Sequence, residues 1–152
     1  MEKTLEGITI TAELSIGKPV AEVFEAVLNP IPYFLKKAGG PLKEGSMVIW
    51  EFAELPKGFP VTGRQIVPNQ LIRFTWPRDE RAVNTVEFTF KPFNEKTTTV
   101  FISESGWPDD AQGRAASYRN CMGWTHMLCS LKAWLEYHVN LRTGSFVHMK
   151  FE

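Results

Sequence analysis

The 152-residue sequence lacks an excess of charge of either sign. Its 17 basic and 17 acidic side chains give a formal net charge of zero. Proteins that bind nucleic acids normally carry a basic surplus, which neutralises the phosphate groups. We therefore expect no nucleic-acid partner for this chain.

A long apolar run and a cleavable signal are also missing. A transmembrane helix needs about 20 predominantly apolar residues, and the sequence contains no such stretch. The first residues, Met1 to Thr4, do not begin a secretory signal peptide. These absences predict a cytoplasmic protein without a membrane span.

Cysteine is scarce, because Cys121 and Cys129 are the only two. They lie in one predicted helix, separated by about 12 Å along its axis, which is beyond the reach of a disulfide. We expect both thiols to be reduced, as is usual in the cytoplasm.

Motifs for metal binding and catalysis are absent as well. His126 and Cys129 share one helical face, but two side chains are too few for a metal site. The stretch from Gly40 to Gly45-Ser46 lacks the lysine of a phosphate-binding loop. No Ser-His-Asp set, carboxylate pair or nucleotide fingerprint occurs. We predict no metal, no cofactor and no motif-defined catalytic residue, which favours a non-enzymatic protein and leaves catalysis open.

Aromatic residues, in contrast, are abundant, at 12% of the chain with 11 Phe and 5 Trp. Several of them alternate with polar residues, a pattern of period two that predicts strands. Successive strands joined by short turns, such as the turn centred on Pro68-Asn69, predict an antiparallel sheet. The predicted strands are 8–14, 47–53, 61–67, 71–76, 86–90 and 100–104.

Helical signals lie on both sides of most of these strands. Pro19 suits the start of a first helix that ends at Asn29-Pro30, and a short second helix is predicted over Tyr33 to Ala38. The longest helix begins at Asp109 or Asp110, either of which suits an N-cap, and ends over 141–144 with Gly144 left-handed. Its apolar stripe consists of Trp124, Leu128, Leu131, Leu135 and His138. The pattern predicts one α+β domain over residues 1–152.

Three segments in this order resemble a known family. They are Ile16 to Phe24, Val67 to Trp76, and Thr99 to Gly106, and the last leads into Gly123-Trp124 and Leu128. They are similar to the START-like (SRPBCC, helix-grip) superfamily, in the branch homologous to the activator of the ATPase of the ninety-kilodalton heat-shock chaperone.

The resemblance covers about 9–137 and leaves 141–152 as a C-terminal extension. Tyr33-Phe34 stands where the family usually carries a tryptophan. The resemblance implies a helix-grip fold, in which a curved antiparallel six-stranded sheet surrounds a long C-terminal helix and two short helices follow the first strand. It also implies a cavity between sheet and helix that takes apolar molecules, and the family name implies a chaperone partner and a role in the stress response.

The aromatic residues on the inward faces of the strands are the first candidates for a ligand site. They either fill the core or line the implied cavity. They are Trp50, Phe52, Phe74, Trp76, Phe88 and Phe90.

Glu104 is the sharpest single candidate, because alternation from Val100 and Ile102 places it on the inward face of the last strand. A buried carboxylate is costly unless it is paired, and Arg64 or Gln65 is the predicted partner. The alternative is that the strand ends early and Glu104 reaches solvent. On the long helix, the candidates for the cavity wall, or for interior packing, are Tyr118, Met122 and Thr125.

Three functions follow from these residues. The leading hypothesis is non-enzymatic binding of a small apolar or aromatic ligand in the cavity. The first alternative is a chaperone-associated or other protein-interaction module, and the second is a cyclase- or hydrolase-like enzyme in which Glu104 is a general acid or base. A cavity without paired titratable groups favours binding, and a closed interior with an exposed apolar patch favours docking.

The C-terminal extension has a pattern of its own. From Ser145 to Glu152 apolar side chains alternate, which predicts a strand that needs a partner edge. This strand joins either its own sheet or the sheet of a second copy, and the second case predicts a homodimer.

Overall fold

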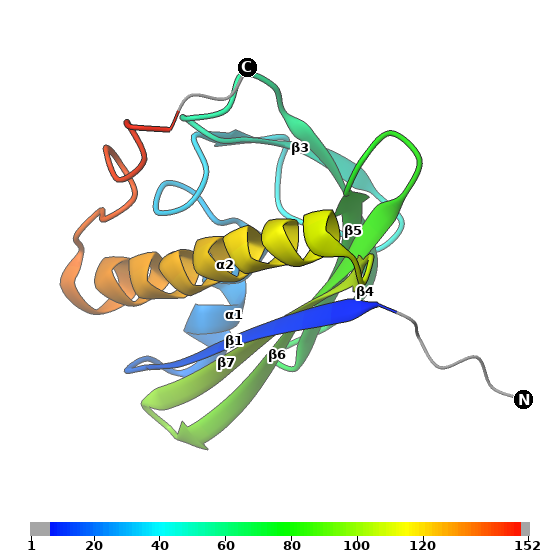
Figure 1. Cartoon of the computed structure of the whole chain (residues 1–152). Coiled ribbons are helices and arrows are strands. Elements are labelled where there is room, and N and C mark those ends of the chain that lie inside the picture. Colours follow the sequence, from blue (N-terminus) through cyan, green and yellow to red (C-terminus); the bar gives the residue numbers. More distant parts are fainter. Residues whose placement is uncertain (1–6, 150–152) are drawn as a thin grey trace, which may run out of the picture.

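The computed structural model describes residues 7–149. Figure 1 shows a long helix, α2, lying across one face of a curved sheet, with the shorter helix α1 near one of its ends. The elements in chain order are β1 (Ile8–Ile16), α1 (Val20–Leu28), β2 (Lys37–Ala38), β3 (Met47–Glu51), β4 (Phe59–Val67), β5 (Leu71–Pro77), β6 (Val83–Asn94), β7 (Thr97–Trp107) and α2 (Ala111–Tyr137). Neither helix within residues 7–149 is long and apolar enough to cross a membrane.

The seven strands form one antiparallel sheet in the order β1-β7-β6-β5-β4-β3-β2. The α+β class and the six predicted strands are confirmed, and the sheet has one strand more than predicted. The turn between β4 and β5 is also as predicted, since Asn69 has a φ of 64° and the Gln70 amide donates to the Val67 carbonyl at 3.0 Å.

The additional strand, β2, replaces the predicted second helix over Tyr33 to Ala38. Residues 31–34 form turns instead, and the backbone amide of Lys36 donates to the carbonyl of Glu51 at 2.9 Å. The amides of Phe34 and Leu35 donate back to the carbonyl of Pro30 at 3.3 and 3.0 Å, which closes a turn just before the chain meets Glu51. The chain therefore pairs with the edge of β3 instead of forming a helix.

The two helices begin as predicted. Pro19 is the N-cap of α1, and the side chain of Asp110 caps α2 by accepting from the Gly113 amide at 2.7 Å. The end of α2 is a correction, since the helix stops at Tyr137 and His138 takes the left-handed conformation with a φ of 56°. The predicted end over 141–144 is wrong because the chain has already left the helix there, but Gly144 is left-handed as predicted, with a φ of 83°.

The core lies between the concave face of the sheet and α2. Alternation along the central strands buries one face of each, as predicted, and the stripe of Trp124, Leu128 and Leu131 on α2 covers them. The apolar strand residues at 0–1% exposure are Ile16, Trp50, Val61, Ile72, Phe74, Val86, Phe88, Val100 and Ile102.

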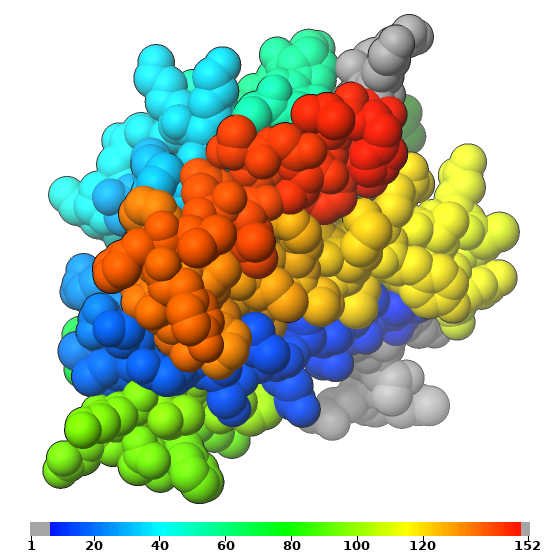
Figure 2. Space-filling view, turned by 90° about the vertical axis from the view of Figure 1, so that its left-hand side faces the viewer, coloured from blue at the N-terminus to red at the C-terminus, as the bar shows by residue number. Residues whose placement is uncertain are grey.

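The C-terminal segment, which we define as residues 138–149, does not form the predicted strand. It makes turns over 142–148, and residues 150–152 of the predicted strand lie outside the described residues. The side chain of Asn140 explains the turns, because its Oδ1 accepts from the amides of Arg142 and Thr143 at 2.9 and 3.0 Å. Figure 2 shows this segment, in orange and red, spread over α2 and reaching the segment that precedes β3.

Candidate functional site

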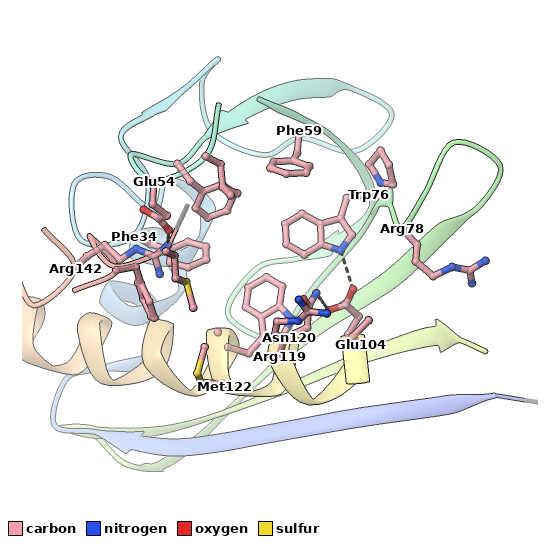
Figure 3. A pocket seen from close by; sticks show the side chains of 18 of the residues that line it. Phe34, Glu54, Phe59, Trp76, Arg78, Glu104, Arg119, Asn120, Met122 and Arg142 are labelled. Carbon is pink, nitrogen blue, oxygen red and sulfur yellow. Dashed lines mark hydrogen bonds and ion pairs between the residues drawn. The ribbon is translucent and has the colours of Figure 1, made fainter. Parts of the chain in front are cut away.

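A cavity of about 380 Å³ opens between the sheet, α2 and the C-terminal segment. Its walls are mainly apolar, and Figure 3 shows Phe34, Phe59 and Trp76 facing it from above α2. Charged groups lie at its two ends, with Glu104 at one and the pair Glu54 and Arg142 at the other. An apolar cavity with a few placed polar groups is the usual form of a small-molecule site.

The alternation of inward and outward side chains along β7 determines the Glu104 end of the cavity. Glu104 is only 1% exposed and pairs with Val86 of β6, so it lies on the inward face as predicted. The next residue on that face is Trp107 instead of Gly106, because Gly106 has a φ of 113° and shifts the alternation by one. A side chain at position 106 would also collide with Asn84, whose Oδ1 would lie 2.5 Å from the added Cβ.

The carboxylate of Glu104 accepts four hydrogen bonds from neutral donors. Oε2 accepts from Trp76 Nε1 at 2.9 Å and from Asn84 Nδ2 at 3.0 Å. Oε1 accepts from Trp124 Nε1 at 2.8 Å and from Asn120 Nδ2 at 3.0 Å. We call these five residues the Glu104 cluster. Hydrogen bonds to a charged acceptor are stronger than those between neutral groups, which allows a buried carboxylate to be held without a cation.

The predicted partners of Glu104 are wrong. Arg64 donates to Thr75 Oγ1 at 3.0 Å, and Gln65 accepts from Arg73 at 2.7 Å. The physical reason is the order of the sheet, in which β4 is separated from β7 by two strands. Both side chains therefore bond to their neighbour β5.

The other end of the cavity is held by Arg142 from the C-terminal segment. Its guanidinium forms an ion pair with Glu54, and these two side chains are only 11% and 14% exposed. The guanidinium also lies 5.2, 5.6 and 4.8 Å from the ring centres of Phe34, Phe52 and Phe146. Burial lowers the pKa of Arg142 to about 10, so it stays charged at neutral pH.

A second cavity, of about 480 Å³, lies on the other side of this pair. The two cavities share a wall made of Phe34, Glu54, Arg142, Phe146 and Met149. Three of these residues belong to the C-terminal segment, which therefore closes one side of the first cavity.

The structure divides the predicted aromatic row into two groups. Phe52 and Trp76 line the cavity, and so does Met122 of α2. The others lie in the core behind them at 0–3% exposure and do not line it: Trp50, Phe74, Phe88 and Phe90. The core residues support the wall directly, since the Phe74 and Trp50 rings lie 5.9 and 6.3 Å from the ring of Trp76.

Two residues predicted on the helix side of the cavity lie elsewhere. Tyr118 is 67% exposed, and Thr125 is exposed with its hydroxyl donating to the Cys121 carbonyl at 2.8 Å. At about 100° per residue, both are turned by roughly 100–120° from Trp124 to one side, whereas the cavity-lining Asn120 and Gly123 lie on its other side. Their placement in the cavity wall was therefore a wrong prediction.

Sequence reasoning missed Asn84, Trp107 and Asn120. Two of them had a readable signal, because alternation continued back from Val86 reaches Asn84, and one helical turn back from Trp124 reaches Asn120. Trp107, which follows Gly106 and lies beyond the predicted strand 100–104, ends β7 at 5% exposure and lines the cavity.

His126 and Cys129 do not belong to a metal cluster in the described part of the chain, where no group of three candidate ligands is found. His126 packs its ring against Phe146 at 4.8 Å and lies 3.3 Å from Ser130 Oγ. Partial burial lowers the pKa of His126 below its ordinary value of 6.5.

Comparison with known proteins gives one family match. The model of the family described as "Activator of Hsp90 ATPase homolog 1-like protein" matches residues 18–136, which include the whole Glu104 cluster and exclude Arg142. No curated protein matches the chain.

Several solved structures share the fold. Protein SSP2350 from Staphylococcus saprophyticus has a TM-score of 0.74 and 23% identity, over 89% of this chain and 96% of that one. The Aha1 dimer from Colwellia psychrerythraea has a TM-score of 0.73 and 17% identity, over 86% and 97% of the two chains. DynU16, a protein of the dynemicin biosynthetic locus, has a TM-score of 0.76 and 20% identity, over 88% of this chain and 49% of that one. Identities this low establish a common fold and nothing finer.

Proposed function

The chain belongs to the family of Activator of Hsp90 ATPase homolog 1-like proteins, and from this premise we propose that it binds a small apolar or aromatic molecule without transforming it. The observation that carries the proposal is the cavity of about 380 Å³, whose walls are mostly rings and aliphatic side chains. Its size falls at the lower end of the range typical of small-molecule sites.

The state of Glu104 supports binding over catalysis. A general acid or base needs a free lone pair or proton within reach of the substrate. Both oxygens of Glu104 already accept two hydrogen bonds each. The described residues that line the cavity also include no His, Cys, Ser, Thr, Tyr or Lys, and the second carboxylate, Glu54, is paired with Arg142 at the other end. These facts weigh against the cyclase- or hydrolase-like alternative.

The chaperone-associated alternative rests on the family description, and the homodimer rests on the likeness to a protein solved as a dimer. Both remain proposals. The C-terminal segment gives the dimer no strand in the described residues, so a dimer would use another surface.

A variant that fills the cavity tests the proposal. Gly123 of α2 lines the cavity, and a Cβ added there meets no atom within 4 Å. Gly123→Leu should lower the affinity for the neutral two-ring probe 2-naphthalenemethanol at least about tenfold, measured by fluorescence titration. Its thermal stability should not fall, because leucine is a better helix former than glycine.

Ala115→Leu is the matched control, since it adds similar bulk on the exposed side of the same helix and should leave the affinity unchanged. Equal binding by all three proteins would place the probe outside the cavity. If no probe of a broad apolar panel binds, the proposed function is wrong, and stimulation of the ninety-kilodalton chaperone's ATPase by the chain would then favour the docking alternative.

A further inference from the structure

The side chains that line the cavity offer few free hydrogen-bond acceptors. Both oxygens of Glu104 are occupied by the four N–H donors, and Glu54 is paired with Arg142. The remaining acceptor is Oδ1 of Asn120, whose Nδ2 donates to Glu104. A ligand that brings mainly donors would therefore find few partners here.

Free donors are more numerous in the same lining. Trp107 is 5% exposed, and its Nε1 has no hydrogen-bond partner among the described residues. Arg119 precedes Asn120 on α2 and forms no ion pair within residues 7–149. Arg78, by contrast, already donates to the Gly106 carbonyl and to Asp79. Figure 3 shows Arg78 directed away from the cavity, while Arg119 lies near Glu104 in that view.

The net charge of the side chains that line the cavity also favours a ligand that brings hydrogen-bond acceptors. Its ionisable side chains are three arginines, Arg78, Arg119 and Arg142, and two glutamates, Glu54 and Glu104, so the sum is +1. Arg142 is paired with Glu54 and Arg78 with Asp79, and Glu104 is held by its four N–H donors. Arg119 is therefore the cation of the lining that forms no ion pair in the described residues. An arginine fork is well suited to bind a carboxylate through two parallel N–H bonds.

The volume limits the size of the apolar part. At the roughly 30 Å³ that a water molecule occupies in the liquid, a cavity of about 380 Å³ holds about a dozen non-hydrogen atoms. A two-ring aromatic body or a medium-length acyl chain fits this limit.

On the basis of the proposed function, we propose that the ligand is a small amphipathic acid. Its apolar body lies against Phe59, Trp76 and Met122, and its anionic oxygens accept from the guanidinium of Arg119 at the Glu104 end. The unpartnered N–H of Trp107 is a second donor at this site. Arg119 is then the residue that sets specificity for an acid over a neutral or cationic analogue.

Three probes with one common apolar body test this assignment. They are 2-naphthoic acid, 2-naphthalenemethanol and 2-naphthylmethylamine, which differ only in a terminal anion, neutral hydroxyl or cation. We expect the acid to bind about tenfold more tightly than the alcohol and the amine to bind most weakly, measured by isothermal titration calorimetry. Added salt should weaken binding of the acid and leave the alcohol unaffected.

Arg119→Gln should remove the preference for the acid and leave the affinity for the alcohol within about twofold. Arg114→Gln is the control, because it removes the same charge from α2 at a position that does not line the cavity. The inference is overturned if acid and alcohol bind equally, if the amine binds best, if Arg119→Gln weakens both probes alike, or if Arg114→Gln abolishes the preference. Failure of every probe to bind would instead refute the proposed function itself.

Discussion

The two ends of the cavity bury charge in different ways. Glu104 has four neutral N–H donors and no cation, whereas Arg142 has the carboxylate of Glu54 and three aromatic rings. The first arrangement joins β5, β6, β7 and α2 through five residues that all lie inside the family match at 18–136. The second attaches the C-terminal segment, which lies beyond that match.

This difference indicates different roles for the two charges. The donors to Glu104 lie on the strands and on α2, which we call the frame of the fold. The Glu104 cluster therefore belongs to this frame. The pair of Glu54 and Arg142 holds the turns of the C-terminal segment against this frame. A segment that lacks the regular backbone hydrogen bonds of a sheet or helix opens more easily than a strand or a long helix. We therefore expect Glu104 to control global stability and Arg142 to control local closure.

The largest expected effect tests the frame. Glu104→Gln replaces one carboxylate oxygen by an NH₂ group, which then faces two N–H donors instead of accepting from them. We expect the free energy of unfolding to fall by about 2–4 kcal/mol, because hydrogen bonds to a charged acceptor contribute about 1.5–3 kcal/mol each and some rearrangement is possible. Urea denaturation monitored by circular dichroism measures the change.

Glu13→Gln is the control for this substitution. Glu13 lies on the exposed face of β1 in the same sheet, so its variant should stay within about 0.5 kcal/mol of the parent. Similar values for both variants would show that the four hydrogen bonds do not hold the frame.

A smaller effect is expected from Arg142→Met, which keeps an apolar stem and removes the guanidinium. The variant leaves Glu54 without its cation, and we expect a loss of about 1–2 kcal/mol. The loss should appear mainly as faster amide hydrogen exchange in residues 138–149, with the central strands unaffected. Uniformly faster exchange across the sheet would contradict the distinction between frame and attachment.

The double variant Glu54→Gln with Arg142→Met refines this result. It removes both charges, so no uncompensated carboxylate remains, and it should recover part of the stability lost by the single variant. A double variant as unstable as the sum of the two single ones would show that the two side chains do not interact.

The smallest effect concerns pH and the contact of His126 with Phe146. Burial lowers the pKa of His126, so the unfolded chain binds more protons than the folded chain just below pH 6.5. Stability should therefore decline as pH falls from 7.5 towards 5.5, and the part due to His126 should be less than about 0.5 kcal/mol. Comparing melting temperatures of the parent and His126→Gln at both pH values isolates this part, and identical pH dependences would contradict it.

The frame was predictable from the sequence where a repeating pattern carried the information. Alternation placed Glu104 and Trp76 on the inward face, and helical spacing placed Trp124 on the stripe of α2. The identity of the partners of Glu104 was not predictable, because it depends on which strands are neighbours in the sheet. The predicted partner Arg64 has the right charge but lies on β4, which two strands separate from β7.

The C-terminal segment shows the opposite case. Its alternation from Ser145 predicts a strand, but local bonds to Asn140 Oδ1 and the burial of Arg142 produce turns. Alternation of period two produces a strand only where the edge of a sheet lies close enough to pair with it. The sequence does not show how far the C-terminal segment lies from such an edge. The two-residue strand β2 was missed for a similar reason, because its existence depends on the carbonyl of Glu51 lying beside Lys36.

The Glu104 cluster also has a consequence for the way the chain reaches this fold. The four donors lie 16 to 28 residues from Glu104 along the chain, and two of them come from α2. If the helix docked one turn out of place, a shift of about 5.4 Å, Asn120 and Trp124 would miss the carboxylate and leave it half-satisfied in an apolar interior. The cluster thus fixes the position at which α2 docks on the sheet. Packings with a shifted helix are costly, which widens the energy gap between them and the native state.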